Sequence, residues 1–157
     1  MDLYIKHFSE LTATELYRIL RARAEVFVVE QNCPYQDVDN KDIGAWHVWF
    51  EDESGIAAYC RVLDKGVSYP NDGSIGRVIT TKRGCSLGYK VMMEGIRVAE
   101  EKFSQVSLRI SAQQYAQGFY EKCGFVRVSE PYLEDDIPHI EMVRAGINGY
   151  VDNLIRR

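Results

Sequence analysis

A glycine-bearing segment at a junction between two regular elements is the strongest chemical signal in the sequence. An apolar run ends at Thr80, helical spacing of apolar residues follows, and between them lies the segment Arg83-Gly84-Cys85-Ser86-Leu87-Gly88. The first N–H groups of a helix are unpaired and carry a partial positive charge, and small residues let a ligand approach the backbone. The segment therefore predicts an anion site suited to a phosphate. The motifs GxxxxGK(S/T) and GxGxxG are absent, which excludes two common phosphate-binding loops.

A second segment, Gln113 to Phe125, combines an apolar stripe with one polar aromatic residue. Ala116, Tyr120 and Cys123 recur at helical spacing, and Gly124 can end a helix in the left-handed conformation. A tyrosine on such a stripe, taken alone, indicates a core residue whose hydroxyl has a hydrogen-bond partner. The spacing by itself thus favours a structural role for Tyr120.

Taken together, the two segments resemble the GNAT (GCN5-related N-acetyltransferase) superfamily. The family pattern Gln/Arg-x-x-Gly-x-Gly/Ala is matched by Arg83 and Gly88, with Ser86 in place of the middle glycine. The later pattern, Asn-x-x-Ala-x-x-Leu/Phe-Tyr-x-x-x-Gly-Phe, is matched by Ala116, Phe119, Tyr120, Gly124 and Phe125, with Gln113 where asparagine is common. The stretches RAEVFVVEQNCPYQDVDNKD, IGRV and YLEDDIPHIEM are similar to the ElaA-like branch of this family.

The resemblance implies an α/β domain with the GNAT fold, in which a mixed, mostly antiparallel sheet of six to seven strands is flanked by helices. It also implies an N-acetyltransferase that moves an acetyl group from acetyl-CoA to a primary amine by direct attack in a ternary complex, without a metal. A backbone N–H between Val78 and Thr80 would meet the oxyanion, and Tyr120 would protonate the departing thiolate. The implied acetyl-CoA contacts are Val78, Ile79, Thr80, Arg83, Gly84, Cys85, Ser86, Leu87, Gly88, Gln113 and Tyr120.

A base is needed when the acceptor amine has a lysine-like pKa of about 10.4, because roughly one molecule in a thousand is then neutral near pH 7.4. Glu134 and His139 are the favoured catalytic candidates, since both lie in the family-like YLEDDIPHI segment, and a strand-orienting role for His139 is equally open. The remaining candidate bases are Glu30, Asp37, Asp39 and Asp135.

The acceptor is expected to be a small-molecule or peptide amine. The residues expected on the acceptor side are Glu30, Gln31, His47 and Glu134, with a partly buried structural histidine as the other reading of His47. The acidic loop residues favour a cationic amine, such as a polyamine or a lysine side chain, and they also fit a plain solvated surface.

The elements that must position these residues are predicted from apolar periodicity and turn residues. Thr12 and Glu15 form a capping-box pattern at the start of a helix that should run to about Val28, and the polar segment Glu30 to Asp42 predicts an ordered loop. The expected strands are Leu3–Phe8, Ala45–Glu51, Ile56–Leu63, Ser74–Thr80, Val106–Ile110, Phe125–Val128 and His139–Val143. Further helices are expected from Leu87 to Phe103 and from Ala112 to Cys123, with the segment PYLEDDIP as a loop.

The length of 157 residues fits one compact domain, which we place at residues 1–144. In the tail, residues 145–157, apolar residues recur at i, i+3, i+4, i+7 and i+8, the pattern of a short amphipathic helix. Such a helix must cover an apolar surface, either on its own domain or on a second subunit of a homodimer.

Composition and charge limit the partners. The formal net charge of −4 gives nucleic acid and anionic membranes no general attraction to the surface. No stretch approaches the roughly 18 apolar residues of a membrane span, and the first residues lack a signal-peptide pattern, so a cytoplasmic protein is expected. Cys33, Cys60, Cys85 and Cys123 include no CxxC pair, which argues against a zinc site or a disulfide framework.

Two other functions are open from the sequence. Ser86 and Gln113 depart from the family patterns, which would suit a non-catalytic acyl-CoA-binding or partner-binding domain that keeps the fold. A thiol-dependent hydrolase or transferase built on Cys85 or Cys123 is the third alternative, although the sequence places no histidine or aspartate to activate either cysteine.

Overall fold

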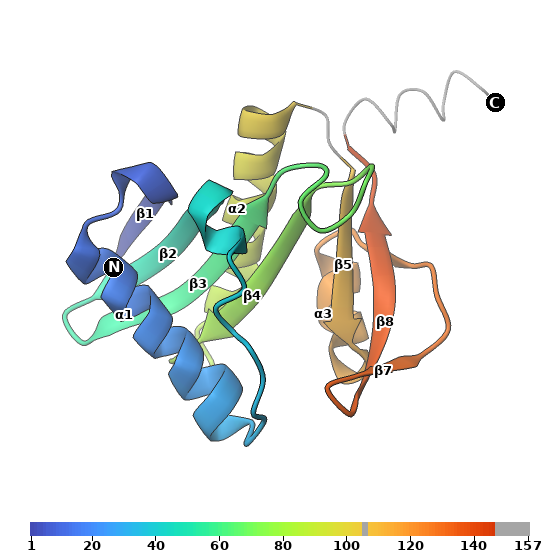
Figure 1. Cartoon of the computed structure of the whole chain (residues 1–157), viewed down its shortest axis with the longest axis horizontal. Coiled ribbons are helices and arrows are strands. Elements are labelled where there is room, and N and C mark those ends of the chain that lie inside the picture. The colour runs from blue at the N-terminus through green and yellow to red at the C-terminus, as the bar shows by residue number, and fades with distance from the viewer. Residues whose placement is uncertain (105–106, 147–157) are drawn as a thin grey trace.

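The computed structural model describes residues 1–104 and 107–146. Its strands form two sheets that meet where β4 and β5 begin (Figure 1). The first sheet has the order β1 (Asp2–His7), β2 (Trp46–Asp52), β3 (Gly55–Leu63) and β4 (Ser74–Thr80), all antiparallel. The second has the order β5 (Leu108–Gln113), β8 (Ile137–Arg144) and β6 (Val126–Arg127), and β7 (Tyr132–Glu134) also pairs with β8. This mostly antiparallel α/β architecture is the predicted one.

β4 and β5 are parallel neighbours joined at their beginnings. The Gly73 N–H donates to the Ser107 carbonyl and the Arg109 N–H donates to the Gly73 carbonyl, each at 2.9 Å. Beyond this point, no backbone hydrogen bond joins the two strands within the described residues. The strands therefore diverge toward Thr80 and Gln113 (Figure 1).

A β-bulge distorts β4 beside this divergence. Between Gly76 and Ile79 the pairing with β3 shifts register, so that Cys60 alone faces both Arg77 and Val78. Arg77 has a φ of +54°, in the left-handed region that residues with a side chain seldom adopt. Such a bulge bends the strand and leaves backbone groups outside the ladder.

Helices lie on both faces of the first sheet (Figure 1). α1 (Ala13–Ala24) begins with the predicted capping box: Thr12 Oγ1 accepts from the Glu15 N–H at 3.1 Å, and Glu15 Oε2 accepts from the Thr12 N–H at 3.0 Å. A π-helical turn (Glu25–Glu30) continues α1 slightly past the predicted end. α2 (Leu87–Phe103) covers the opposite face and begins at the predicted residue.

The core forms a layer on each face of the first sheet. Because successive strand residues point to opposite faces, Val48 and Cys60 pack in the layer that contains α2, whereas Trp49 and Tyr59 pack in the layer that contains α1. α2 approaches β3 closely at Gly95, where a Cβ atom would lie 2.8 Å from the Cys60 sulfur. Packing on both faces holds β3 and β4 firmly, and these strands carry much of the site.

Two local predictions are wrong because long-range pairing overrides local periodicity. The helix expected from Ala112 begins later: Ala112 and Gln113 pair with β8 and belong to β5, and α3 covers Gln117–Lys122 after a 3-10 turn. The loop expected at PYLEDDIP instead forms β7 and a tight turn at Asp135 and Asp136, both with positive φ. This turn places the family-like segment on a hairpin.

The predicted tail falls almost wholly outside the described residues. Its amphipathic helix, its part in a homodimer and the domain boundary at residue 144 therefore stay predictions. Within residues 1–104 and 107–146, no helix is both long enough and apolar enough to cross a membrane.

Candidate active site

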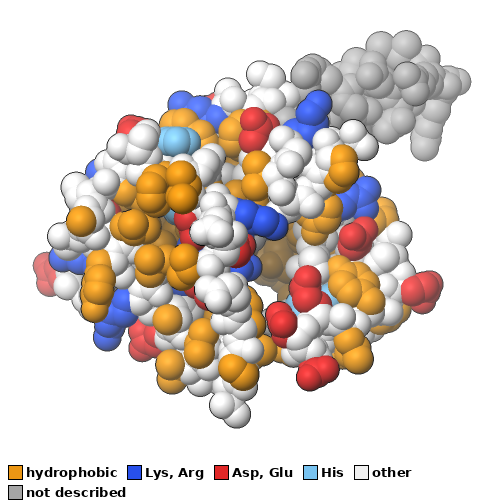
Figure 2. All heavy atoms as spheres, viewed as in Figure 1, with side chains coloured by type: hydrophobic (Ala, Val, Ile, Leu, Met, Phe, Trp, Pro, Cys, Tyr) orange, Lys and Arg blue, Asp and Glu red, His pale blue; other side chains and the backbone are white. Residues whose placement is uncertain are grey.

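A cleft of about 450 Å³ opens between the diverging strands β4 and β5. One side is lined by residues 31–41 and by Arg77 of β4, and we call these residues the loop wall. The other side is lined by residues 134–139 of the β7–β8 hairpin with Ser111 of β5, and we call these the hairpin wall. Tyr120 of α3 also lines the cleft. Figure 2 shows the hollow between the two walls, with acidic side chains at its edge on the hairpin side.

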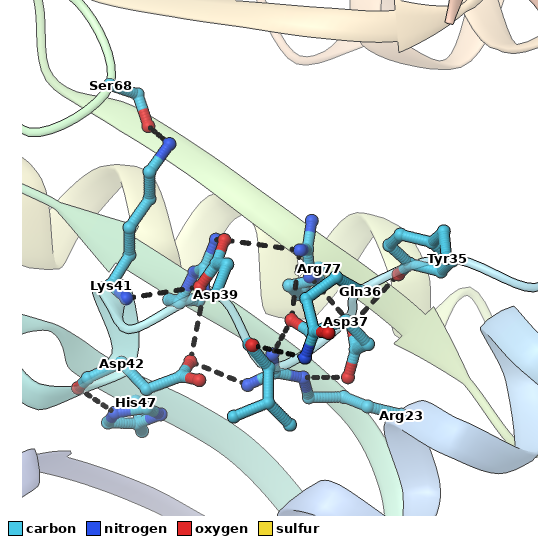
Figure 3. Close-up of polar contacts among 12 residues, drawn as sticks. Arg23, Tyr35, Gln36, Asp37, Asp39, Lys41, Asp42, His47, Ser68 and Arg77 are labelled. Atoms are coloured by element: carbon cyan, nitrogen blue, oxygen red, sulfur yellow. Dashed lines mark hydrogen bonds and ion pairs between the residues drawn. The ribbon is translucent and has the colours of Figure 1, made fainter. Parts of the chain in front are cut away.

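The loop wall stands on a buried ionic network (Figure 3). Arg23 of α1 is 0% exposed; its Nε lies 3.1 Å from Asp37 Oδ2 and its Nη1 lies 2.6 Å from Asp42 Oδ1. Arg61 of β3 extends the network, with its Nη1 2.7 Å from Asp39 Oδ1 and 3.1 Å from Asp42 Oδ1. The acidic loop is thereby fastened to the helix before it and to the sheet beneath it.

Arg77, the bulge residue, completes this network from the cleft side. Its Nε lies 2.8 Å from Asp37 Oδ1, and its Nη2 lies 3.2 Å from Asp39 Oδ2 and donates to the Asp37 carbonyl at 3.1 Å. The guanidinium also stands over the Tyr35 ring, 5.4 Å from its centroid. Its Nη1 has no hydrogen-bond partner among the described residues. These contacts compensate for the strained backbone of Arg77 and tie the loop wall to the bulge.

The arginines favour the ionised forms of Asp39 and Asp42. Burial alone would raise the pKa of Asp39, but its hydrogen bonds with Arg61 and the nearby charge of Arg77 outweigh burial and lower that pKa to about 2. Burial likewise opposes ionisation of Asp42, and contacts with Arg23 and Arg61 lower its pKa. Three guanidinium groups thus face three carboxylates, and the network carries no net charge. Asp37 and Asp39, both candidate bases from the sequence, are committed to these ion pairs.

His47 lies inside the domain, so its predicted place at the acceptor pocket is wrong. The side chain is 0% exposed, with Nδ1 2.7 Å from the Tyr59 hydroxyl and Nε2 3.0 Å from the Asp42 carbonyl. Burial lowers the pKa of His47, which favours the neutral ring. Glu30 is exposed and lies outside the cleft lining, whereas Gln31 lines the cleft.

The hairpin wall brings together the two catalytic candidates. His139 Nδ1 lies 2.6 Å from the Ile137 carbonyl, and because a carbonyl only accepts, Nδ1 carries the proton. His139 Nε2 then faces Glu134 Oε2 at 3.2 Å. Ser111 Oγ donates to the same Glu134 oxygen at 3.2 Å. Nε2 is therefore the nitrogen that can take up a proton from a ligand in the cleft, and Glu134 would stabilise the resulting imidazolium.

Tyr120 presents a neutral phenol to the cleft. Its ring packs edge-on against Phe119 and Phe125, with centroids 5.0 and 6.0 Å away. Burial raises the pKa of Tyr120 to about 12, so the hydroxyl keeps its proton at neutral pH. The hydroxyl makes no hydrogen bond to any described residue, which departs from the satisfied core tyrosine that spacing alone favoured. It is available as a hydrogen-bond donor.

The glycine-bearing segment forms a second hollow, of about 480 Å³, at the start of α2. Gly84 and Ser86 both have positive φ, and Ser86 is the N-cap residue, but its side chain makes no capping hydrogen bond. The first turn of α2 holds no acidic residue, so its positive end is not neutralised. The hollow is lined by Thr80, Lys82, Arg83, Gly84, Ser86, Leu87, Gly88, Tyr89, Phe119 and Lys122.

Most of the predicted acetyl-CoA contacts gather in these two hollows. Val78, Gln113 and Tyr120 line the cleft, and Thr80 joins the glycine-bearing segment in the second hollow. The Ile79 side chain is 2% exposed and packs in the α1 layer, so only its backbone is available. Cys85 is exposed beside the second hollow, whereas burial raises the pKa of Cys123, the opposite of what a thiolate nucleophile needs.

Arg77 and Lys41 are among the cleft-lining residues that were missed from the sequence. A lone arginine in a short strand gives no sign of a bulge, and a lysine in a polar loop is typical of any surface. A partial signal was available in the loop: three aspartates within six residues need counter-charges if the loop is ordered and packed.

Comparisons with known proteins agree with this geometry. Residues 24–145 match the family model described as an acetyltransferase (GNAT) domain. Protein ElaA of Escherichia coli (strain K12) is 40% identical over 147 residues, covering 90% of this chain and 94% of ElaA. A crystal structure of an acyl-CoA N-acyltransferase from Pseudomonas aeruginosa has a TM-score of 0.86 at 42% identity, covering 92% of this chain and 100% of that one. The crystal structure of Escherichia coli ElaA has a TM-score of 0.84 at 37% identity, covering 92% and 99%.

Proposed function

This chain belongs to the GNAT acetyltransferase family, and from that premise we propose that it transfers an acetyl group from acetyl-CoA to a primary amine. The observation that carries the proposal is the cleft between β4 and β5. It joins the phenol of Tyr120 and the imidazole of His139, whose Nε2 faces Glu134, in a single cavity. Direct attack on a thioester needs a proton acceptor on the amine side and a donor on the sulfur side.

The second hollow supports an acyl-CoA as the donor. Its backbone N–H groups at the start of α2, with Lys82, Arg83 and Lys122 nearby, suit a pyrophosphate. Lys82 is ion-paired with Asp52, so Arg83 and Lys122 are the cations more freely available to a phosphate. Ser86 replaces a family glycine but already adopts the left-handed conformation that glycine favours, with a φ of +54°. The replacement is therefore compatible with the same loop geometry.

His139 would act as the base toward the amine. Deprotonating a lysine-like amine near pH 7.4 costs about 4 kcal/mol, and a positioned base offsets this as the C–N bond forms. The amine proton passes to His139 Nε2, because Nδ1 is already committed to the Ile137 carbonyl. Glu134, 3.2 Å from Nε2, then faces a positive ring.

The bulge and Tyr120 would act on the thioester. Backbone N–H groups between Val78 and Thr80 are the candidate donors to the oxyanion, a contribution of about 3 kcal/mol in comparable sites. As the C–S bond breaks, sulfur leaves with the electron pair and the Tyr120 hydroxyl hydrogen-bonds to it. Because the Tyr120 pKa, about 12, exceeds that of a thiol, about 8.5, we propose that the phenol stabilises the thiolate as a donor and does not surrender its proton outright.

The test combines titration calorimetry with acetyl-CoA and CoA and a thiol-release assay against a panel of primary amines. We expect micromolar binding, amine-dependent release of CoA, and a loss in kcat of about tenfold to 100-fold for Tyr120→Phe, because a hydrogen bond to a charged group contributes about 1.5–3 kcal/mol. Tyr17→Phe is the matched control, since Tyr17 is 73% exposed on α1 and should leave turnover unchanged. Binding without release for any amine would overturn the catalytic proposal in favour of an acyl-CoA-binding domain.

A further inference from the structure

The charges left over on the two cleft walls are opposite in sign. On the loop wall, Asp39 and Arg77 are balanced within the ionic network. The Lys41 backbone N–H donates to Asp39 Oδ1 at 3.1 Å, but its side chain lies outside the network: Nζ donates to Ser68 Oγ at 2.9 Å and forms no ion pair with a described residue. The positive charge that remains for a ligand on this wall is the Lys41 ammonium, and Arg77 adds Nη1 as a hydrogen-bond donor without a partner among the described residues; both residues line the cleft.

The hairpin wall is left with negative charge. Glu134 and Asp135 both line the cleft, and Asp135 forms no ion pair with any residue in the described ranges. Glu134 lies 3.2 Å from His139 Nε2, and no lysine or arginine of the described residues forms an ion pair with it. Neutralisation of the three loop aspartates removes the reason to expect a polycationic acceptor. The cleft-lining carboxylates that have no arginine partner, Glu134 and Asp135, both lie on the hairpin wall.

We propose that the acceptor is an amino carboxylate, a free amino acid or a peptide that bears a carboxylate, a conclusion that rests on the proposed acetyl transfer. Its amine lies at the hairpin wall beside the Glu134–His139 pair, where the proton is removed. Its carboxylate lies at the loop wall and accepts from Lys41 and from Arg77 Nη1. A diamine of the same length would place its second ammonium against these two cations and would be disfavoured.

The experiment compares acceptors that differ only in the carboxylate. γ-Aminobutyrate, ε-aminohexanoate and lysine are each assayed beside the corresponding primary amide, with cadaverine as the diamine, and kcat/KM is measured by thiol release. For at least one length, we expect the carboxylate to be favoured over its amide and over cadaverine by tenfold or more. In Lys41→Met the preference should fall at least threefold, and in Lys41→Glu it should invert in favour of cadaverine.

Lys65→Glu is the matched control, because Lys65 is exposed and lines neither hollow. The substitution changes the charge by the same amount as Lys41→Glu. In this control, the preference for the carboxylate over its amide and over cadaverine should stay within twofold of the preference of the unaltered chain. Turnover of amides and cadaverine at least as fast as the carboxylates would overturn this inference and leave the acetyltransferase proposal standing. The same conclusion follows if both Lys41 variants keep the preference of Lys65→Glu. Absence of turnover with every amine would contradict the acetyltransferase proposal, and the inference with it.

Discussion

The loop wall and the hairpin wall both carry acidic residues from polar segments of the sequence, but these acids have different partners. Asp37, Asp39 and Asp42 are held by arginines from α1, β3 and β4. Glu134 meets a histidine, and Asp135 meets no counter-charge among the described residues. The first set stabilises the fold beside the cleft, and the second leaves charge available to a ligand. The same residue type therefore has a structural or a chemical role according to its partners.

Removing one buried cation should have the largest effect on stability. Arg23→Met leaves Asp37 and Asp42 short of a counter-charge at a site with 0% exposure, and we expect the free energy of unfolding to fall by about 3–5 kcal/mol. Glu134→Gln, on the hairpin wall, should change it by less than about 0.5 kcal/mol. Urea denaturation monitored by tryptophan fluorescence measures both. Losses of similar size in the two variants would remove the distinction between the walls.

His139→Gln should have the largest effect on rate. Without the base, we expect kcat for a lysine-like amine to fall by about 100-fold or more, and kcat for an α-amine of lower pKa to fall less. His7→Gln is the control, since His7 lies on β1 outside the cleft. Steady-state thiol release measures each value. An equal loss for both kinds of amine would mean that His139 orients its strand and does not accept the proton.

Asp39 makes the contribution of the loop wall to folding stability depend on pH in the acidic range. Its folded-state pKa of about 2 lies below the ordinary value of 3.8, so its stabilisation is present above pH 4 and is lost as pH falls through about 2. The shift corresponds to about 2 kcal/mol at most. The difference in unfolding free energy between the unaltered chain and Asp39→Asn should therefore shrink as pH falls from 4 to 2. Parallel pH series of urea denaturation for the two proteins measure this convergence, and a difference that stays constant from pH 4 to pH 2 would contradict it.

Local sequence signals predicted those features whose causes are local. The Thr12–Glu15 capping box, the strand Ser74–Thr80 and the start of α2 at Leu87 all depend on residues within a few positions of each other. The candidate cofactor segment was found for the same reason, since a glycine-bearing turn before a helix is recognisable from its own residues.

Features that depend on distant partners were missed. Ala112 and Gln113 fit a helical stripe, yet pairing with β8 makes them strand. His47 alternates with apolar residues as a cleft-facing histidine would, but Tyr59 and the Asp42 carbonyl engage it inside the domain. The arginines that neutralise the loop lie on three other elements. Spacing alone therefore could not show which acids remain available.

The most direct test of the contrast between the walls measures stability and activity on the same preparations of Asp42→Asn and Glu134→Gln. We expect Asp42→Asn to lose several kcal/mol of unfolding free energy and, at a temperature where it stays folded, to keep kcat/KM within about threefold. We expect Glu134→Gln to unfold like the unaltered chain and to lose about tenfold or more in kcat/KM. The reverse pattern, or equal losses of stability and activity in both variants, would contradict the division between a structural and a reactive wall.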